Sequence, residues 1–169
     1  PVGIELDGLK LGIIGFGASG KELARRAHAF GMRILAIDIR EVGDDEVREF
    51  GVQFVGKPDS LDKVIGESDV PSLHLHLNSG TRHTIDARRL RLMKPSAYLI
   101  NVARGALADE VALEQALGSG QIAGAGLDAF AQEPPDINSE LFSMLNVVTT
   151  PHIAGVTDGT SRKRAKAAA

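Results

Sequence analysis

The sequence predicts an α/β fold in which a doubly wound, mostly parallel sheet carries helices on both faces. Two observations support this prediction. Short apolar runs alternate with segments of helical periodicity along nearly the whole chain. The runs are flanked by Gly, Pro, Asp or Ser, and repeated strand–helix–strand units form parallel sheets with right-handed crossovers.

Seven apolar runs are the predicted strands. Their short length, polar flanks and branched residues are typical of strands buried on both faces. In chain order they are Leu11–Ile14, Ile34–Ile37, Val52–Val55, Leu73–Leu75, Tyr98–Val102, Ala125–Leu127 and Val147–Thr149.

Two predicted helices have clear end signals. The first covers Lys21–Phe30 and stops at Gly31, while another is opened by Asp109 and closed by Gly118. The apolar positions that define them are Leu23, Ala24, Ala27, Phe30, Val111, Leu113, Ala116 and Leu117.

Two more helices are predicted in the remaining segments. One covers Ile85–Met93 and ends before Pro95, and the other covers Asp158–Ala169, in Ala-rich sequence. No internal repeat, low-complexity linker or second domain is visible. Residues 1–169 are therefore predicted to form a single domain.

The composition is that of an ordinary globular protein, with 43% hydrophobic and 24% charged residues. A net charge of −3 gives no general attraction to nucleic acid or anionic membranes, and the basic residues within 162–166 are typical of a solvated helix face. The absence of cysteine excludes disulfides and thiolate metal sites. Without a signal peptide or an apolar run of about 20 residues, we expect a cytoplasmic protein.

The segment 15–20 is a G-x-G-x-x-G motif between the first predicted strand and the first predicted helix. The first Gly permits a tight turn, the second lets the backbone approach a pyrophosphate, and the third allows close helix–strand packing. The free N–H groups of the first helical turn then face the anion. This context predicts a Rossmann-type domain whose dinucleotide site includes Gly15, Phe16, Gly17, Ala18 and Ser19.

Asp38 ends the second predicted strand, eighteen positions after Gly20. An acidic residue at this place accepts hydrogen bonds from the adenosine ribose and repels a 2′-phosphate, so NAD is favoured over NADP. Two alternatives stay open. Arg40, two residues later, would soften the preference for NAD, and a solvated Asp at the end of a strand would have no role in binding.

Arg104 follows the fifth predicted strand, in the segment 101–105. Ligands of open α/β sheets bind beyond the carboxyl ends of the strands. The planar guanidinium of Arg104 suits the carboxylate of an anionic substrate, although a structural salt bridge would use the same residue type.

Glu133 and His152 follow the sixth and seventh predicted strands. A histidine that exchanges a proton near neutral pH suits hydride transfer to a carbonyl, and a carboxylate on its other nitrogen would hold the tautomer. Spacing along the chain does not place the two side chains together. The other histidines have more typical structural positions: His28 on the first helix, His74 in the core and His83 in a polar turn.

From Leu9 to about Thr157 the chain resembles the cofactor domain of the D-isomer-specific 2-hydroxyacid dehydrogenases, which include phosphoglycerate, D-lactate, glycerate and hydroxypyruvate/glyoxylate enzymes. The matching segments are LGIIGFGASG, SDVPSLHLHLNSGTRHTI, LMKPSAYLINVARGALADEVALEQALGSGQIAGAGLDAFAQEP and NVVTTPHIAG. The resemblance implies an NAD-linked oxidoreductase that transfers a hydride between the nicotinamide and a small D-2-hydroxy or 2-keto acid.

The same resemblance assigns roles to individual residues. It implies that Arg104 binds the substrate carboxylate and carbonyl, that His152 is the acid/base, and that Glu133 is its acidic partner. Asp128 corresponds to a residue near the nicotinamide carboxamide. The other positions that it implies along the dinucleotide are Leu75, His76, Val102, Ala103, Arg104, His152 and Ala154.

Three positions depart from the pattern of that family. His76 stands where Pro is usual, and Ser19 replaces Ile or Leu. Ala154 and Gly155 change a stretch often written Gly-Gly or Gly-Ala, at the edge of the nicotinamide pocket.

Members of the family also have a substrate domain, formed by residues on both sides of the matching region, which closes the cleft against water. We therefore expect residues 1–169 to be a dinucleotide-binding domain without that second domain, and to turn over little substrate alone. The implied partners are a small 2-hydroxy or 2-keto acid and a second copy in a full-length homodimer, with no nucleic acid or membrane.

A non-enzymatic module that senses NAD is the alternative function. Transcriptional corepressors of the family keep the Arg–Glu–His set, so Arg104, Glu133 and His152 do not exclude it. Stoichiometric NAD binding without turnover by the full-length protein would support this alternative. Formate dehydrogenases share the fold but place Gln at the position of Glu133, so the chain resembles them less.

Overall fold

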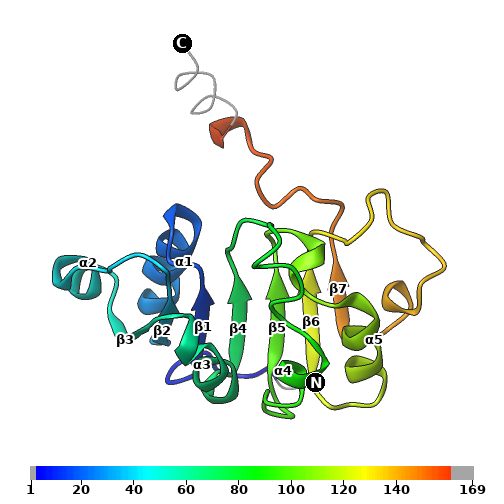
Figure 1. The fold of residues 1–169 in the computed structure, drawn as a ribbon, viewed down its shortest axis with the longest axis horizontal. Coiled ribbons are helices and arrows are strands. Elements are labelled where there is room, and N and C mark those ends of the chain that lie inside the picture. Colours follow the sequence, from blue (N-terminus) through cyan, green and yellow to red (C-terminus); the bar gives the residue numbers. More distant parts are fainter. Residues whose placement is uncertain (1–2, 161–169) are drawn as a thin grey trace.

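A computed structural model describes residues 3–160 and contains one seven-stranded sheet (Figure 1). Every pair of neighbouring strands is parallel, and the strand order is β3-β2-β1-β4-β5-β6-β7. The order changes direction between β1 and β4, which opens a crevice beyond the carboxyl ends of these strands. The predicted fold class, a doubly wound parallel sheet of the Rossmann type, is confirmed.

Each predicted apolar run contains or overlaps a strand. The strands are β1 (Lys10–Ile14), β2 (Arg33–Ile37), β3 (Val52–Gly56), β4 (Val70–Leu73), β5 (Tyr98–Asn101), β6 (Gly124–Leu127) and β7 (Val147–Thr149). The bounds predicted for β4, Leu73–Leu75, are wrong, because the strand already ends at Leu73. Pro71 obscured its beginning in the sequence. The strand tolerates this proline because its ladder with β5 begins only at Ser72.

Five α-helices connect or flank the strands in the described part of the chain. They are α1 (Ala18–Ala29), α2 (Asp44–Glu49), α3 (Leu61–Glu67), α4 (Ala87–Leu90) and α5 (Glu110–Gly118). Helix α5 matches its prediction, and the Asp109 carboxylate caps it by accepting from the N–H of Ala112 at 3.2 Å. Helix α1 begins three residues before the predicted Lys21, and α2 and α3 were not predicted.

Helix α4 is shorter than the predicted helix Ile85–Met93. Ile85 instead forms an isolated bridge with Ala108, and Asp86 caps the helix by accepting from the N–H of Arg89 at 2.7 Å. Of the helix predicted over 158–169, residues 158–160 are helical and the others lie outside the described residues, as do the basic residues within 162–166.

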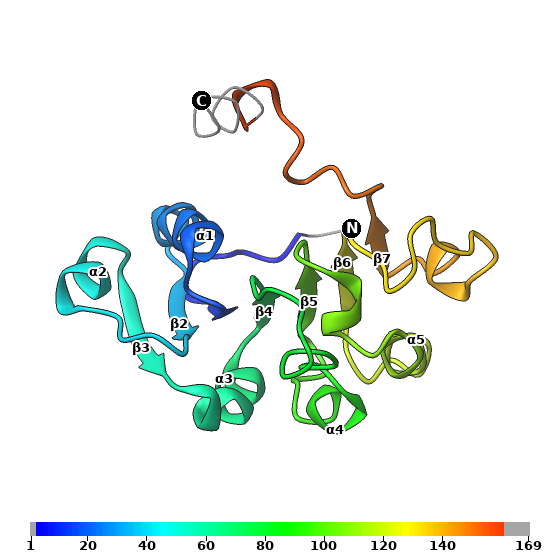
Figure 2. The same ribbon diagram turned by 45° about the horizontal axis from the view of Figure 1, so that its top comes forward.

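Alternate residues of the strands pack against different helical layers. On β1, Ile13 belongs to the core under α1, whereas Ile14 belongs to the core under α3 and α5. Figure 2 shows α1 and α2 on one side of the sheet and α3, α4 and α5 on the other. Two of the apolar positions that define the predicted helices are exposed: Phe30 at the end of α1 is 65% exposed and Val111 on α5 is 69% exposed. The short side chains of Ala24 and Ala27 fill the close contact between α1 and the sheet.

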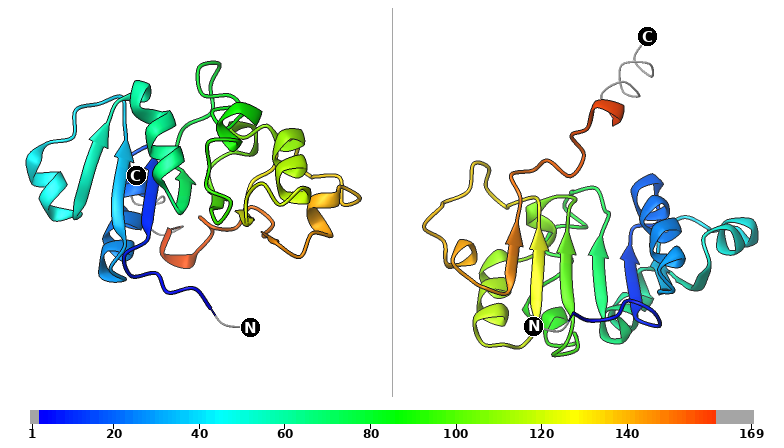
Figure 3. Two further views of the ribbon diagram at one scale, coloured as in Figure 1. Left: turned by 90° about the horizontal axis from the view of Figure 1, so that it is seen from below. Right: turned by 180° about the vertical axis from the view of Figure 1, so that it is seen from behind.

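A cavity of about 920 Å³ lies against a face of the sheet and not at the strand ends. Tyr98 of β5, Val148 of β7 and Leu6 of the segment before β1 line it. In the view from behind, that segment runs across the lower end of the sheet (Figure 3). The only carboxylate of the cavity, Asp69, is bonded to Lys10 and Lys94. None of the predicted site residues lines this cavity. No helix within residues 3–160 is long and apolar enough to cross a membrane.

Candidate active site

The loops that carry the predicted site residues leave the carboxyl ends of the strands, along the upper edge of the sheet in Figure 1. Two cavities of about 460 and 570 Å³ lie there. His74, Leu75 and His76 line both cavities, so the two form one cleft. The first half contains the glycine-rich loop, and the second contains Arg104 and His152, whereas Glu133 lines a neighbouring cavity that His152 also borders.

Steric contacts explain two of the three glycines of the loop. Gly15 has a φ of +101°, and a Cβ there would lie 2.7 Å from the carbonyl oxygen of His74. A Cβ at Gly20 would lie 2.4 Å from the carbonyl oxygen of Gly15. Gly17 differs, because a Cβ there would meet no atom within 4 Å. Gly15 and Gly20 are therefore required by packing, whereas Gly17 borders open space.

The start of α1 fits the pyrophosphate of a dinucleotide. Gly17 is the N-cap residue and no side chain caps it. The N–H groups of the first helical turn have no acceptor within the helix, and the helix dipole is positive there. The space beside Gly17 and these donors suit a phosphate anion, so the residues present fit the predicted cofactor.

Asp38 ties the glycine-rich loop to the end of β2. Its carboxylate accepts from the N–H of Phe16 at 2.8 Å and from the N–H of Arg40 at 2.9 Å. The carboxylate lines the 460 Å³ half of the cleft together with Gly17. The Phe16 ring instead packs in the core against Phe50, with ring centroids 5.9 Å apart, and does not reach the cleft.

His74 connects the two halves of the cleft. Ser19 Oγ lies 2.9 Å from its Nδ1, and Ser72 Oγ lies 3.0 Å from its Nε2. Burial lowers the pKa of His74 to about 4, so the ring is neutral at pH 7. The expectation that His74 belongs to the core is thus only partly met, because the ring also lines the cleft. Ser19, which stands where Ile or Leu is usual, supplies one of the two hydrogen-bond partners of the His74 ring.

The loop after β5 presents Arg104 to the 570 Å³ half of the cleft. Buried Asn101 shapes this loop, since its side chain donates to the carbonyl of Arg104 at 2.9 Å and accepts from the N–H of Ala103 at 3.2 Å. The Arg104 guanidinium donates to the carbonyl of Ala103 at 2.6 Å and, within residues 3–160, forms no ion pair. The structural salt bridge considered as an alternative is therefore absent from the described part of the chain.

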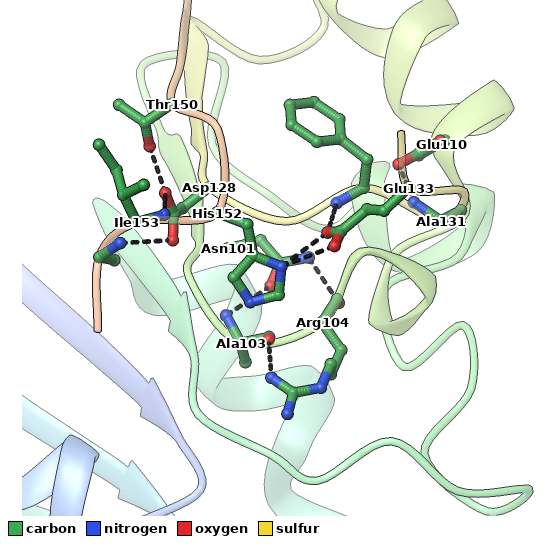
Figure 4. A network of polar contacts seen from close by, with 12 residues as sticks. Asn101, Ala103, Arg104, Glu110, Asp128, Ala131, Glu133, Thr150, His152 and Ile153 are labelled. Carbon is green, nitrogen blue, oxygen red and sulfur yellow. Dashed lines mark hydrogen bonds and ion pairs between the residues drawn. The ribbon is translucent and has the colours of Figure 1, made fainter. Parts of the chain in front are cut away.

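Glu133 and His152 meet across the loops after β6 and β7 (Figure 4). The two carboxylate oxygens lie 2.7 and 2.9 Å from Nδ1 of His152. An ionised carboxylate only accepts, so Nδ1 carries the hydrogen and Nε2 is left for a ligand. The hydrogen bond from His152, followed by that from the N–H of Phe130 at 3.0 Å, lowers the pKa of Glu133.

Asp128 anchors the loop that carries His152 (Figure 4). Its buried carboxylate accepts from the Thr150 hydroxyl at 2.5 Å and from the N–H groups of Ile153 and Ala154, both at 2.8 Å. Burial acts to raise the pKa of Asp128, but these hydrogen bonds outweigh it and the pKa lies below its ordinary value. They hold His152 at a φ of +54°, an uncommon conformation for a residue with a side chain.

The other predicted residues divide between the cleft and its surroundings. Val102 and Ala103 line the 570 Å³ half, with Leu75 and His76. Ala18, the first residue of α1, and Ala154 line neither half. Asn101 and Thr150, which position the site, were not singled out in the sequence. A polar residue at the end of a buried apolar run was the available signal for Asn101.

Comparison with known proteins agrees with this arrangement. Residues 1–154 match the sequence model of the NAD binding domain of the D-isomer specific 2-hydroxyacid dehydrogenases. The chain is 46% identical to a glyoxylate reductase of Thermococcus onnurineus over 158 residues, which cover 94% of this chain and 46% of the relative. It is 43% identical to a hydroxypyruvate reductase of Thermotoga maritima over 163 residues, which cover 95% of this chain and 51% of the relative.

A solved structure with bound NAD has a similar fold. The NAD-complexed D-isomer specific 2-hydroxyacid dehydrogenase of Lactobacillus delbrueckii superposes with a TM-score of 0.87 at 36% identity. The match covers 98% of this chain and 52% of that one. The chain thus spans about half the length of the relatives that it matches.

Proposed function

The chain belongs to the D-isomer-specific 2-hydroxyacid dehydrogenase family, and we propose that it forms the NAD-binding and acid/base half of such an oxidoreductase. The reaction interconverts a small D-2-hydroxy acid and the corresponding 2-keto acid. The observation that carries this proposal is the pair formed by Glu133 and His152, which lies beside Arg104 at one end of the cleft.

Residues of the first half of the cleft would hold the cofactor. The N–H groups around Ala18 and Ser19 would bind the pyrophosphate, and Asp38 would bind the adenosine ribose. When bound, the nicotinamide supplies or accepts the hydride. Asp38 and the space beside Gly17 support NAD as the cofactor.

His152 would move the proton. Its Nε2 donates a proton to the carbonyl oxygen during reduction and accepts one from the hydroxyl during oxidation. Glu133 fixes the tautomer through Nδ1 and stabilises the imidazolium. Because the pKa of Glu133 is lowered, the carboxylate stays ionised at neutral pH, where it serves this role.

Arg104 would bind the substrate carboxylate. Its guanidinium forms no ion pair in the described part of the chain, and a planar fork suits a carboxylate bidentately. The names of the relatives support small 2-keto acids such as glyoxylate and hydroxypyruvate as substrates. A homodimer of the whole protein stays an expectation.

Substitution of His152 tests the proposed function. We expect His152→Gln to lower kcat for glyoxylate or hydroxypyruvate reduction by about a thousandfold, the usual contribution of a general acid. The affinity for NADH should stay unchanged. His28→Gln, an exposed change on α1, is the matched control. Full activity of His152→Gln would refute the assignment, and NADH binding without any turnover by the whole protein would favour the NAD-sensing module.

A further inference from the structure

Three cationic side chains surround the carboxyl end of β2. Lys21 comes from α1, Arg40 from the loop after β2, and Lys57 directly follows β3. Lys57 pairs with Glu41 at 2.9 Å. Lys21 and Arg40 both pair with the single carboxylate of Glu46. Each of the three cations thus has an acidic partner, although Lys21 and Arg40 share one carboxylate.

Both terminal nitrogens of the Arg40 guanidinium donate hydrogen bonds within the protein. One terminal nitrogen donates to the carbonyl of Phe16 at 2.8 Å. The other donates to the carbonyl of Glu41 at 2.9 Å and to the carboxylate of Glu46 at 2.6 Å. The guanidinium is therefore held against the outside of the glycine-rich loop.

Glu46 lies in the first turn of α2 and pairs with both Lys21 and Arg40. One carboxylate oxygen accepts from Lys21 and the other accepts from Arg40. The pair is half-buried, with the Glu46 side chain 27% exposed and the Arg40 side chain 39% exposed. These two hydrogen bonds, from Lys21 first and then Arg40, lower the pKa of Glu46, so it is ionised at neutral pH.

We propose that Glu46 determines the choice between NAD and NADP by holding Arg40 away from the place of a ribose 2′-phosphate. This inference rests on the proposed function, since it assumes that Asp38 faces the adenosine ribose. Glu46 thus acts as a specificity-determining residue without contact to the cofactor. If its pair with Glu46 were broken, the Arg40 guanidinium would bind the phosphate.

The charges beside Asp38 explain why release of Arg40 matters. A phosphate monoester carries about −1.5 to −2 charges at pH 7 and needs a cation, most often a guanidinium fork. Arg40 follows Asp38 by two residues, and its N–H is bonded to the Asp38 carboxylate. Its side chain therefore starts at the edge of the ribose site. A 2′-phosphate would gain Arg40 as a partner only if the Arg40–Glu46 pair were broken, and the intact pair keeps the guanidinium on Glu46 and the Phe16 carbonyl.

Titration of the chain with NADH and with NADPH tests the inference. We expect Glu46→Gln to tighten NADPH binding about tenfold, the effect of one charge-assisted hydrogen bond. NADH affinity should change less than about twofold, because Glu46 lines neither half of the cleft. Glu49→Gln is the matched control, since Glu49 lies on the same helix and pairs with Arg25. It should change neither affinity.

Two variants of Arg40 complete the test. In the double variant Glu46→Gln/Arg40→Ala, the gain in NADPH affinity should disappear. Arg40→Ala alone should leave NADPH affinity unchanged within about twofold, because the guanidinium of the wild type does not reach the phosphate. This second expectation does not depend on the folding of the Glu46 variant.

Three outcomes would overturn the inference. They are unchanged NADPH affinity in Glu46→Gln, a gain that persists without Arg40, and weaker NADPH binding by Arg40→Ala alone. Failure of the wild-type chain to bind either dinucleotide would instead count against the proposed cofactor site, so the two failures are distinguishable.

Discussion

The two halves of the cleft are built by different means. The glycine-rich loop takes its shape from missing side chains, because a Cβ at Gly15 or Gly20 would collide with backbone atoms. The loop of His152 takes its shape from hydrogen bonds to Asp128, which precedes its partners in that loop by 22 to 26 residues. The glycines that shape the first half lie within six neighbouring residues, although Asp38 and His74 also contact that loop, whereas the anchor of the second half lies in a different loop. Substitutions in the two halves should therefore have different effects.

Gly20→Ala should have the largest effect and should act on stability. The new Cβ would lie 2.4 Å from the carbonyl oxygen of Gly15, and neither backbone segment moves easily. We expect a loss of about 4 kcal/mol in the free energy of unfolding, measured by urea denaturation. Gly17→Ala is the control, because its Cβ enters open space. It should keep stability and weaken only NADH binding, and a matching loss of stability in Gly17→Ala would contradict this account.

Asp128→Ala should have the next largest effect and should act on the other half. It removes the acceptor of all three hydrogen bonds that hold the loop of His152, so we expect a loss of about 3 kcal/mol. Hydrogen exchange at those two amides should accelerate while exchange at α1 stays slow. Asp136→Ala, in an exposed turn, should do neither. Unchanged exchange at Ile153 and Ala154 would show that Asp128 does not anchor the loop.

The same contrast explains how far the site could be predicted from sequence. The glycine motif and Asp38 were accessible because local sterics and a fixed spacing specify them. Contact between Glu133 and His152 could not be derived, because it depends on how the loops after β6 and β7 fold together. The catalytic roles of these residues stay predictions, and so does the contact of Phe16 with the cofactor.

The fold shows a related limit. The strands were predicted because burial on both faces produces a short continuous run of branched apolar residues in the sequence. The bounds of β4 were missed, since Pro71 and buried Ser72 break its apolar run. Helix α2 was missed because none of its residues is buried and its charged sequence lacks an apolar face. Phe30 was included in the predicted first helix, but it is the C-cap residue of α1 and its side chain is exposed.

Acid should destabilise the contact between the two halves, because His74 bridges them. Its folded pKa of about 4 lies below its ordinary value of 6.5, so the folded state binds fewer protons. Its contribution is complete above pH 6.5 and is lost as the pH falls toward 4, by about 3 kcal/mol. His74→Gln should flatten this part of the pH–stability curve. An equally steep curve in the variant would assign the loss to other groups.

Thr150→Val should have the smallest effect. It removes one of the three hydrogen bonds to Asp128 and leaves both N–H donors in place. We expect a loss of about 1 kcal/mol in thermal unfolding. A loss as large as that of Asp128→Ala would mean that the hydroxyl, and not the backbone donors, fixes the carboxylate.

The central claim is that both halves bind one dinucleotide, with its pyrophosphate at the start of α1 and its nicotinamide beside His152. Titration of the isotope-labelled chain with NADH, followed through backbone amide resonances, tests it directly. The account predicts that the amides of Gly17 and Ala18 and those of Ala103 and Ile153 shift along one saturation curve. Shifts confined to one half, or different midpoints for the two halves, would contradict it.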